Sequence, residues 1–272
     1  MHAFNSIRCV ERFIKMKGKK SAVGIEVENI TKVFNRRTVL NDLSFSVQPG
    51  EVFVLMGPSG TGKSVLLRLM AGLDSATSGH ICIEGTPLKE VKRKNKYVLG
   101  LVFQAGALFN SLSIFDNLAL YFREHRSCSE ADISKRIERV LTLLNLKGTE
   151  HQMPSSLSGG MKKRVALARG LLMEPDVLLF DEPTSELDLL TASSIIELIG
   201  SVNRRLGITT VIASHDILLA KSIGHHIGIL QKGTLDAVYT PETLLHSENA
   251  FIKNFLNPTI DLDHPQFPSF LL

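Results

Sequence analysis

The chain of 272 residues is 44% hydrophobic, enough to bury a core as one large domain or two small ones. Its formal net charge of +4 is mild, and no Lys/Arg cluster alternates with aromatic residues, which argues against nucleic acid as a partner. The three scattered cysteines, Cys9, Cys82 and Cys128, exclude a disulfide framework and a zinc site. No apolar run approaches the roughly 20 residues that span a bilayer, so any membrane role requires a partner.

Residues 1–23 form a basic arm without the apolar segment and cleavage site of a signal peptide. Two interpretations stay open for it: a disordered extension, or a chain whose true start is Met16. From Gly24, the runs GIEVENITKVF and RTVLNDLSFSV are rich in β-forming residues and are joined by the polar Asn35-Arg36-Arg37. They predict a small β-sheet.

The sequence GPSGTGKS, Gly57 to Ser64, follows the apolar run EVFVLM and precedes SVLLRLMAGL, which has helical spacing. It matches the P-loop pattern in its required strand-loop-helix setting. Its glycines allow successive N–H groups to converge on a polyphosphate at the helix N-terminus. Lys63 supplies charge for the outer phosphates, and the Ser64 hydroxyl suits Mg²⁺. A glycine-rich turn without a ligand is the alternative.

The middle of the chain predicts a strand at HICIEG, a solvated basic connection over Lys89 to Tyr97, and a core strand over Leu99 to Phe103. From about Leu112 to Arg169 the apolar i, i+3, i+4 spacing predicts helices. We therefore expect an inserted helical subdomain at about 105–170.

The runs DVLLF and ITTVIAS are short and continuously apolar, as in parallel strands covered on both faces. A helix of about 15 residues is expected between them, forming a βαβ unit. A strand pair turning at Lys232-Gly233 and two short helices then complete a domain over 24–256. The tail, 257–272, is expected to be extended; it either docks its apolar end on a partner or is disordered.

Two carboxylates end the buried strand of VLLFDE. Open α/β sheets bind ligands at the carboxyl edge of their strands, and the P-loop lies at the same edge. Asp181 is placed to hold Mg²⁺, and Glu182 to polarise the water that attacks a γ-phosphate. Solvated acids at a strand end are the alternative. Gln104 and His215 also follow core strands, where Gln104 could meet the metal or the attacking water and His215 the γ-phosphate.

The sequence LSGGM opens the predicted helix MKKRVALARGLLM. Ser158, Gly159 and Gly160 offer a hydroxyl and N–H groups to an anion at the helix N-terminus. An ordinary capped helix start is the alternative. Because the chain already has one phosphate cradle, a second one makes most sense if it serves the nucleotide of another copy.

These motifs, in this order, resemble the nucleotide-binding domains of ABC transporters over roughly Ile25 to Leu256. The resemblance implies an α/β P-loop NTPase with a mixed sheet core, an antiparallel β subdomain and an inserted helical subdomain. It implies an ATPase that works as a homodimer with integral membrane permease subunits, with ATP and Mg²⁺ as cofactors. It implies these roles: catalytic, Glu182, His215, Lys63 and Gln104; nucleotide-binding, Phe34, Gly57, Pro58, Ser59, Gly60, Thr61, Gly62, Lys63, Ser64, Ser158, Gly159, Gly160 and Asp188; metal-binding, Ser64, Gln104 and Asp181.

The loop from Ser185 to Asp188 resembles the one that crosses the dimer interface of the family. It departs from the usual pattern at Glu186, where a small residue is common, and at Leu189, where proline is common.

Within the family, FQAGALFNSLSIFDNLALYFREH and the LSGGM segment resemble the ATPase of Mla-type transporters, which move phospholipid with MCE-domain partners. This resemblance implies a place at the cytoplasmic face of the inner (plasma) membrane. Two alternatives stay open: the ATPase of another ABC importer or exporter, for amino acids or lipoproteins, and a soluble ABC protein without a transport role.

Overall fold

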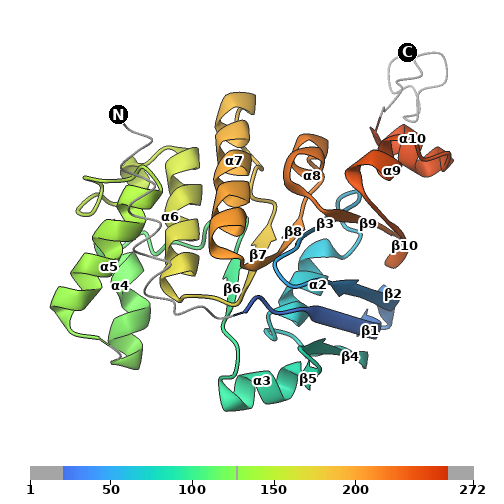
Figure 1. Ribbon diagram of the computed structural model, residues 1–272, viewed down its shortest axis with the longest axis horizontal. Coiled ribbons are helices and arrows are strands. Elements are labelled where there is room, and N and C mark those ends of the chain that lie inside the picture. Colours follow the sequence, from blue (N-terminus) through green and yellow to red (C-terminus); the bar gives the residue numbers. More distant parts are fainter. Residues whose placement is uncertain (1–20, 127, 257–272) are drawn as a thin grey trace, which may run out of the picture.

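A computed structural model describes residues 21–126 and 128–256 of the chain. Figure 1 shows two sheets with helices packed around them. The predictions for residues 1–20, including Cys9, and for the tail 257–272 fall outside the described residues.

The larger sheet has six strands in the order β10-β9-β3-β8-β7-β6. All neighbours are parallel except β10, which runs antiparallel to β9. Its strands are β3 (Val52–Met56), β6 (Leu99–Val102), β7 (Val177–Asp181), β8 (Thr209–Ala213), β9 (His226–Gln231) and β10 (Thr234–Tyr239). The carboxyl ends of β3, β6, β7 and β8 therefore lie at one edge, where the predicted catalytic residues begin.

The smaller sheet is antiparallel and has four strands in the order β2-β1-β4-β5. They are β1 (Ile25–Phe34), β2 (Arg37–Val47), β4 (Ser78–Ile83) and β5 (Thr86–Pro87). Asn35 and Arg36, between β1 and β2, both have positive φ. This conformation at both central residues is typical of a tight hairpin turn, which explains the polar residues there.

The helices connect and cover these sheets. They are α2 (Lys63–Met70), α3 (Leu88–Lys94), α4 (Ile114–His125), α5 (Glu130–Leu143), α6 (Gly159–Leu172), α7 (Leu189–Leu206), α8 (Ile217–Ile223), α9 (Pro241–Leu245) and α10 (Ala250–Leu256), with a 3₁₀ turn at Pro154–Ser156. The βαβ unit of β7, α7 and β8 is present as expected.

The segment from Lys89 to Tyr97, expected to be a solvated basic connection, is mostly exposed and contains α3, which the sequence did not predict. Val91 is fully buried against the rest of the protein, while Glu90 and Lys94 form an i,i+4 ion pair at 2.8 Å on the outside. One buried residue and an exposed charge pair are enough for a short helix here, although the many lysines hide the apolar spacing. The sequence analysis also missed α8.

Each face of the larger sheet carries its own core, and β3 contributes to both. Val54 and Met56 pack with α6, α7 and α8, whereas Phe53 and Leu55 pack with α2 and the antiparallel sheet. This alternation of side chains along one strand explains why β3 is continuously apolar. The P-loop follows β3 directly, so it starts from a strand that is buried at every position.

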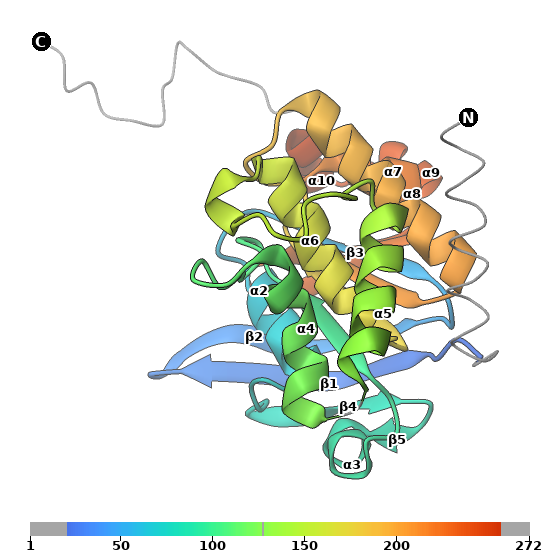
Figure 2. The ribbon, with the colours of Figure 1, turned by 90° about the vertical axis from the view of Figure 1, so that its left-hand side faces the viewer.

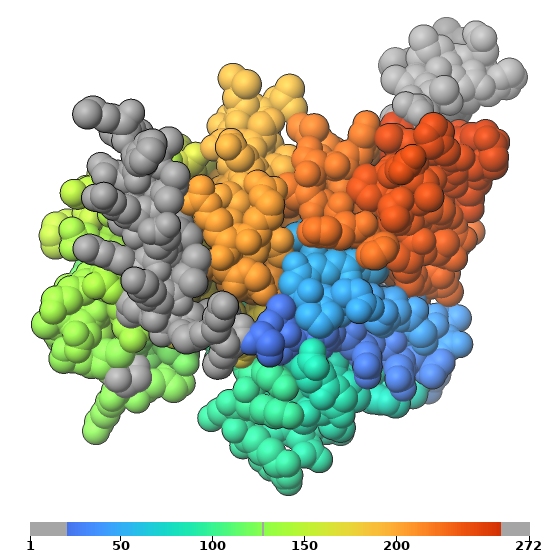
Figure 3. All heavy atoms as spheres, in the orientation of Figure 1, coloured from blue at the N-terminus to red at the C-terminus, as the bar shows by residue number. Residues whose placement is uncertain are grey.

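Helices α4, α5 and α6 pack against one another and form the helical part predicted by the sequence. In the view of Figure 2, α4 and α5 lie in front of α6, and the lower end of α4 crosses in front of the antiparallel sheet. In the space-filling view they form the green end of the molecule, opposite the C-terminal elements in red (Figure 3). The fold class is therefore the predicted one, while the subdomain bounds of about 105–170 stay a prediction.

Candidate active site

The P-loop joins β3 to α2 through glycines that no other residue replaces without strain. Gly57, Gly60 and Gly62 all have positive φ. A Cβ at Gly57 would lie 2.2 Å from the carbonyl oxygen of Leu230, and one at Gly62 would lie 2.5 Å from Leu40 Cδ2. Backbone conformation and lack of space therefore both require glycine at these two positions.

The N-terminus of α2 is open to an anion. Its N-cap, Gly62, provides no side chain to cap the helix, and no acidic residue lies in the first turn. The N–H groups of a helix start carry partial positive charge and seek acceptors. This combination suits a phosphate group.

Lys63 lies beneath the loop, with its side chain 6% exposed. Its Nζ donates hydrogen bonds to the carbonyl oxygens of Gly57 at 2.7 Å and Pro58 at 3.2 Å. The same Nζ lies 3.6 Å from Oε1 of Glu182. The ammonium group thus connects the loop to the end of β7.

Ser64 and Asp181 provide a pair of hard oxygen atoms at the carboxyl edge. Ser64 Oγ donates to Asp181 Oδ1 at 2.8 Å. Burial raises the pKa of the Asp181 carboxyl, and the charge of Glu182 adds to this effect, while the Ser64 hydrogen bond opposes it. Mg²⁺ takes oxygen ligands of these kinds beside phosphates, so the donor set fits the predicted ion.

Glu182 follows β7 in a left-handed conformation, with φ of 47°. Its N–H donates to the carbonyl of Ala213 at 2.9 Å, which fixes the turn against β8. Glu182 Oε2 lies 2.9 Å from His215 Nδ1 and also accepts a hydrogen bond of 3.5 Å from Ser214 Oγ. Side-chain contacts with the next strand therefore hold the carboxylate in place.

A hollow of about 340 Å³ is lined by all four predicted catalytic residues. Its lining includes Val39, Ser59, Gly60, Gly62, Lys63, Ser64, Val65, Gln104, Glu182 and His215. These residues come from β2, from the P-loop and the first turn of α2, from the segment after β6, and from the segments that follow β7 and β8. The four predicted catalytic residues thus face one space of a size that suits a phosphate chain.

Other predicted residues lie outside this lining. Phe34 is 41% exposed at the end of β1, with Lys32 Nζ 4.6 Å from its ring centre. Ser158 caps α6 by accepting from the N–H of Met161, and Asp188 caps α7 by accepting from Leu190 and Thr191. Within one chain, Ser158 and Asp188 therefore act as helix caps.

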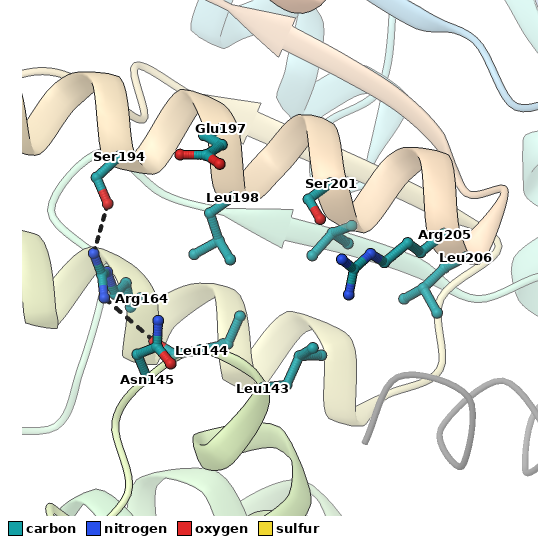
Figure 4. A pocket seen from close by; sticks show the side chains of 11 residues that line it. Leu143, Leu144, Asn145, Arg164, Ser194, Glu197, Leu198, Ser201, Arg205 and Leu206 are labelled. Carbon is teal, nitrogen blue, oxygen red and sulfur yellow. Dashed lines mark hydrogen bonds between the residues drawn. The ribbon is translucent and has the colours of Figure 1, made fainter. Parts of the chain in front are cut away.

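A second hollow, of about 300 Å³, lies between α5, α6 and α7 and contains none of the predicted site residues. In Figure 4, Arg164 reaches from α6 to Ser194 on α7, with a hydrogen bond of 2.7 Å. Leucines such as Leu143 and Leu198 line its walls. We assign no chemistry to this space.

The sequence analysis missed two polar residues that hold the loop after Gln104. Asn117 is completely buried and bonds the backbone of Phe109, Leu112 and Ser113. Lys163, on α6, donates to the carbonyls of Gln104 and Glu182. An asparagine among the apolar residues of α4 could have indicated a buried polar contact at Asn117. Nothing in the sequence MKKR, by contrast, distinguishes Lys163 from its charged neighbours.

No helix within the described ranges is both long and apolar enough to cross a membrane. Likewise, no group of three or more His, Cys, Asp or Glu residues suited to a metal occurs in that part of the chain.

Comparison with known proteins adds three findings. The sequence matches the family described as ABC transporter over residues 40–185. It is 38% identical over 245 residues to the probable ribonucleotide transport ATP-binding protein Mkl of Mycobacterium bovis, covering 89% of this chain and 68% of that protein.

Two solved structures are similar to the whole fold. The dimeric post-hydrolysis state of the ATP-binding cassette MJ0796, bound to ADP and Pi, has a TM-score of 0.72 and 30% identity, covering 80% of this chain and 98% of that one. The cbiO1 protein of Clostridium perfringens, part of the ABC transporter complex cbiONQ, has a TM-score of 0.75 and 27% identity, covering 88% and 96%.

Proposed function

The chain belongs to the ABC transporter family and is an ATP-hydrolysing subunit of such a transporter, and we propose that the cargo it drives is phospholipid. The observation that carries the lipid proposal is the resemblance of Phe103 to His125, together with LSGGM, to Mla-type ATPases. The partners would be a membrane permease and an MCE-domain protein. The chain would sit at the cytoplasmic face of the inner membrane, bound to the permease.

We propose that two copies face each other with C2 symmetry and enclose ATP between them. The P-loop of one copy would hold the phosphates, and Ser158, Gly159 and Gly160 of the other would contact the γ-phosphate. The exposed position of Ser158, away from its own chain's hollow, supports this arrangement. A similar cassette is dimeric with ADP and Pi bound, which supports it further.

Within each site, Glu182 would accept the proton of the attacking water. His215 would orient this carboxylate and donate a hydrogen bond to the γ-phosphate. Lys63 would move its N–H donors from the loop carbonyls to the phosphates, because phosphate oxygens are the stronger acceptors. These roles follow from side chains that share one hollow.

Ser64, Asp181 and Gln104 would hold Mg²⁺. When bound, the ion neutralises charge on the phosphates. The test without turnover is thermal: Mg²⁺ should add to the stabilisation by ATP in the wild type, and Asp181→Asn should lose that addition. An Asp181→Asn protein that responds to Mg²⁺ as the wild type does would remove Asp181 from the metal site.

Apolar side chains on either side of Gln104 would supply a surface for the permease. Phe103 and Phe109 are 37% and 52% exposed, respectively. Further along the chain, Phe115, Ile137 and His151 line a groove. Such a groove accepts an amphipathic helix from a partner. The segment after Gln104 would then transmit conformational changes from the ATP site to the membrane subunit.

A second candidate is the ATPase of a transporter for polar solutes. The name of the relative from Mycobacterium bovis, which refers to ribonucleotide transport, favours it. Every residue proposed for ATP hydrolysis would keep its role. Only the cargo and the partner proteins would differ, because they depend on other subunits.

The deciding experiment is a pull-down of the full chain from its native membrane in mild detergent. Mass spectrometry would identify the proteins and lipids that accompany it, and a Phe109→Asp variant would show which partners depend on the apolar surface. A permease, an MCE-domain protein and phospholipid are expected. A permease with a soluble solute-binding protein and no enriched phospholipid would contradict the lipid proposal and support the second candidate.

A further inference from the structure

Lys163 connects two loops of the candidate active site through one ammonium group. It lies in the second turn of α6 and is partly buried. Its Nζ donates to the backbone oxygen of Gln104, to the backbone oxygen of Glu182 at 3.2 Å, and to Ser185 Oγ at 3.1 Å. An ammonium group has three N–H donors, so these contacts use all of them.

The acceptors belong to segments that meet only in the folded protein. Gln104 follows β6, whereas Glu182 and Ser185 both lie in the loop that joins β7 to α7. Ser185 Oγ also donates to the Glu182 carbonyl at 2.8 Å, which closes a small network around the same oxygen. Neither loop can therefore shift relative to α6 without breaking a bond to Lys163.

A second cation of α6 holds the same loop further along. Arg169 donates to the carbonyls of Gly106 at 2.9 Å and Ala107 at 2.8 Å. The segment after Gln104 is thus tied to α6 at two points. Among the residues that the structure describes, Arg169 hydrogen-bonds only this loop. Lys163 also bonds the Glu182 loop, so Lys163 is the link between the two loops.

Partial burial of the Lys163 ammonium group is energetically unfavourable and requires compensating contacts. Burial lowers the pKa of its ammonium group, while the charges of Glu186, Glu182 and Asp181 act in the opposite direction. Lysine is usually exposed, and taking its charge out of water is unfavourable. The three hydrogen bonds offset that cost only while both loops are in place.

We infer that Lys163 is a positioning residue that sets the backbone of Gln104 and Glu182 relative to each other for ATP hydrolysis. It would act through Glu182 and Gln104, whose backbone oxygens accept its hydrogen bonds. The inference rests on the roles proposed for these two residues. Since Ser158 caps the same helix, Lys163 also links the surface that would meet a partner's ATP to the hydrolytic carboxylate of its own chain.

The test compares Lys163→Met and Lys163→Arg in the full-length chain. Methionine keeps the length and the apolar stem but removes every N–H donor, whereas arginine restores donors. Lys162→Met is the matched control, because the Lys162 side chain makes no hydrogen bond or ion pair with another described residue. The readouts are kcat, the affinity for a fluorescent ATP analogue, and the melting temperature.

We expect Lys163→Met to lower kcat by about tenfold or more, since small misplacements of reacting groups are costly. Analogue affinity and melting temperature should match those of Lys162→Met, and Lys163→Arg should recover part of kcat. Equal kcat in Lys163→Met and Lys162→Met would overturn the inference. A parallel loss of affinity and kcat, or no recovery with arginine, would also overturn it, because either indicates a general structural role.

Two further variants keep the test decisive. If Lys163→Met does not melt cooperatively, Lys163→Gln is compared with Lys162→Gln instead. A lower kcat in Lys163→Gln would support the inference, and equal kcat in the two variants would overturn it. Glu182→Gln is measured alongside. Normal turnover in Glu182→Gln would refute the proposed role of Glu182, whereas a slow Glu182→Gln with a fast Lys163→Met would refute only the inference about Lys163.

Discussion

His215 Nδ1 lies 2.9 Å from Oε2 of Glu182, and Lys63 Nζ lies 3.6 Å from the other carboxylate oxygen. An ionised carboxylate only accepts hydrogen bonds, so Nδ1 must carry the proton in this contact. The imidazole Nε2 is then the nitrogen available to a phosphate. Glu182 is thus oriented from both sides by groups that also face the nucleotide hollow.

Replacing His215 by alanine tests this orientation. We expect kcat for ATP hydrolysis to fall by about a hundredfold, as for loss of one positioned catalytic group. ATP binding should change little, because the P-loop contacts remain. The exposed His246, at the end of α9, provides the control His246→Ala. A His215→Ala protein that loses ATP affinity in the same proportion as kcat would contradict the proposed role.

Glu182→Gln removes the proposed proton acceptor and keeps the shape of the side chain. Hydrolysis should slow by about a thousandfold while ATP still binds. Because ATP would then persist between two copies, the dimer should accumulate, which light scattering with and without ATP measures. Glu197→Gln, on the exposed side of α7, is the control. Unchanged turnover in Glu182→Gln would exclude it as the acceptor.

Asn117 stabilises the loop that follows Gln104. Its amide nitrogen donates to three carbonyls and its oxygen accepts from the N–H of Phe109, all within a buried site. Asn117→Ala should lower the free energy of unfolding by about 3 kcal/mol, since it leaves several backbone groups without partners. Urea denaturation measures this, with the exposed Asn110→Ala as control. Equal stability of the two variants would contradict the assignment.

Arg123 joins α4 to α5 and makes stability depend on pH. Its guanidinium bonds Asp116 at 2.8 Å and Glu130 twice at 2.9 Å. The Arg123 hydrogen bond holds the pKa of Glu130 below its usual range, and Ser113, followed by Arg123, does the same for Asp116. A carboxyl group whose pKa is lower in the folded than in the unfolded protein stabilises the fold fully at pH values above its pKa in the unfolded protein. This stabilisation is lost as the pH falls through the pKa that the group has in the folded protein.

Arg123→Met should therefore lower the melting temperature at pH 7 by about 2 °C, as expected for exposed ion pairs. The difference from the wild type should shrink as pH drops below about 4, where both carboxyl groups take up protons. Melting curves across this pH range check it, with the exposed Lys135→Met as control. A difference that stays constant with pH would show that Arg123 acts through packing alone.

Sequence and structure agree where a short segment sets its own backbone. The turn at Lys232-Gly233 was predicted and has positive φ at both residues, at 49° and 84°. The glycines of the P-loop were likewise expected, because helix starts and tight turns demand particular backbone angles from adjacent residues. The apolar runs identified the buried strands for a similar reason, since strands covered on both faces are apolar throughout.

Tertiary packing alone decided which side chains meet. Glu182 could be selected as a strand-end acid, but its contacts with His215 and Lys63 depend on the order of β3, β7 and β8 in the sheet. Lys163 is one of several cations in α6, and only the packing of that helix brings it to two loops at once. Backbone conformation is a local property of the chain, whereas the partners that a polar side chain contacts depend on residues far away in sequence. The sequence by itself therefore determined the glycine-rich loop and the strands beneath it, and the tertiary structure decided how the Glu182 carboxylate is held.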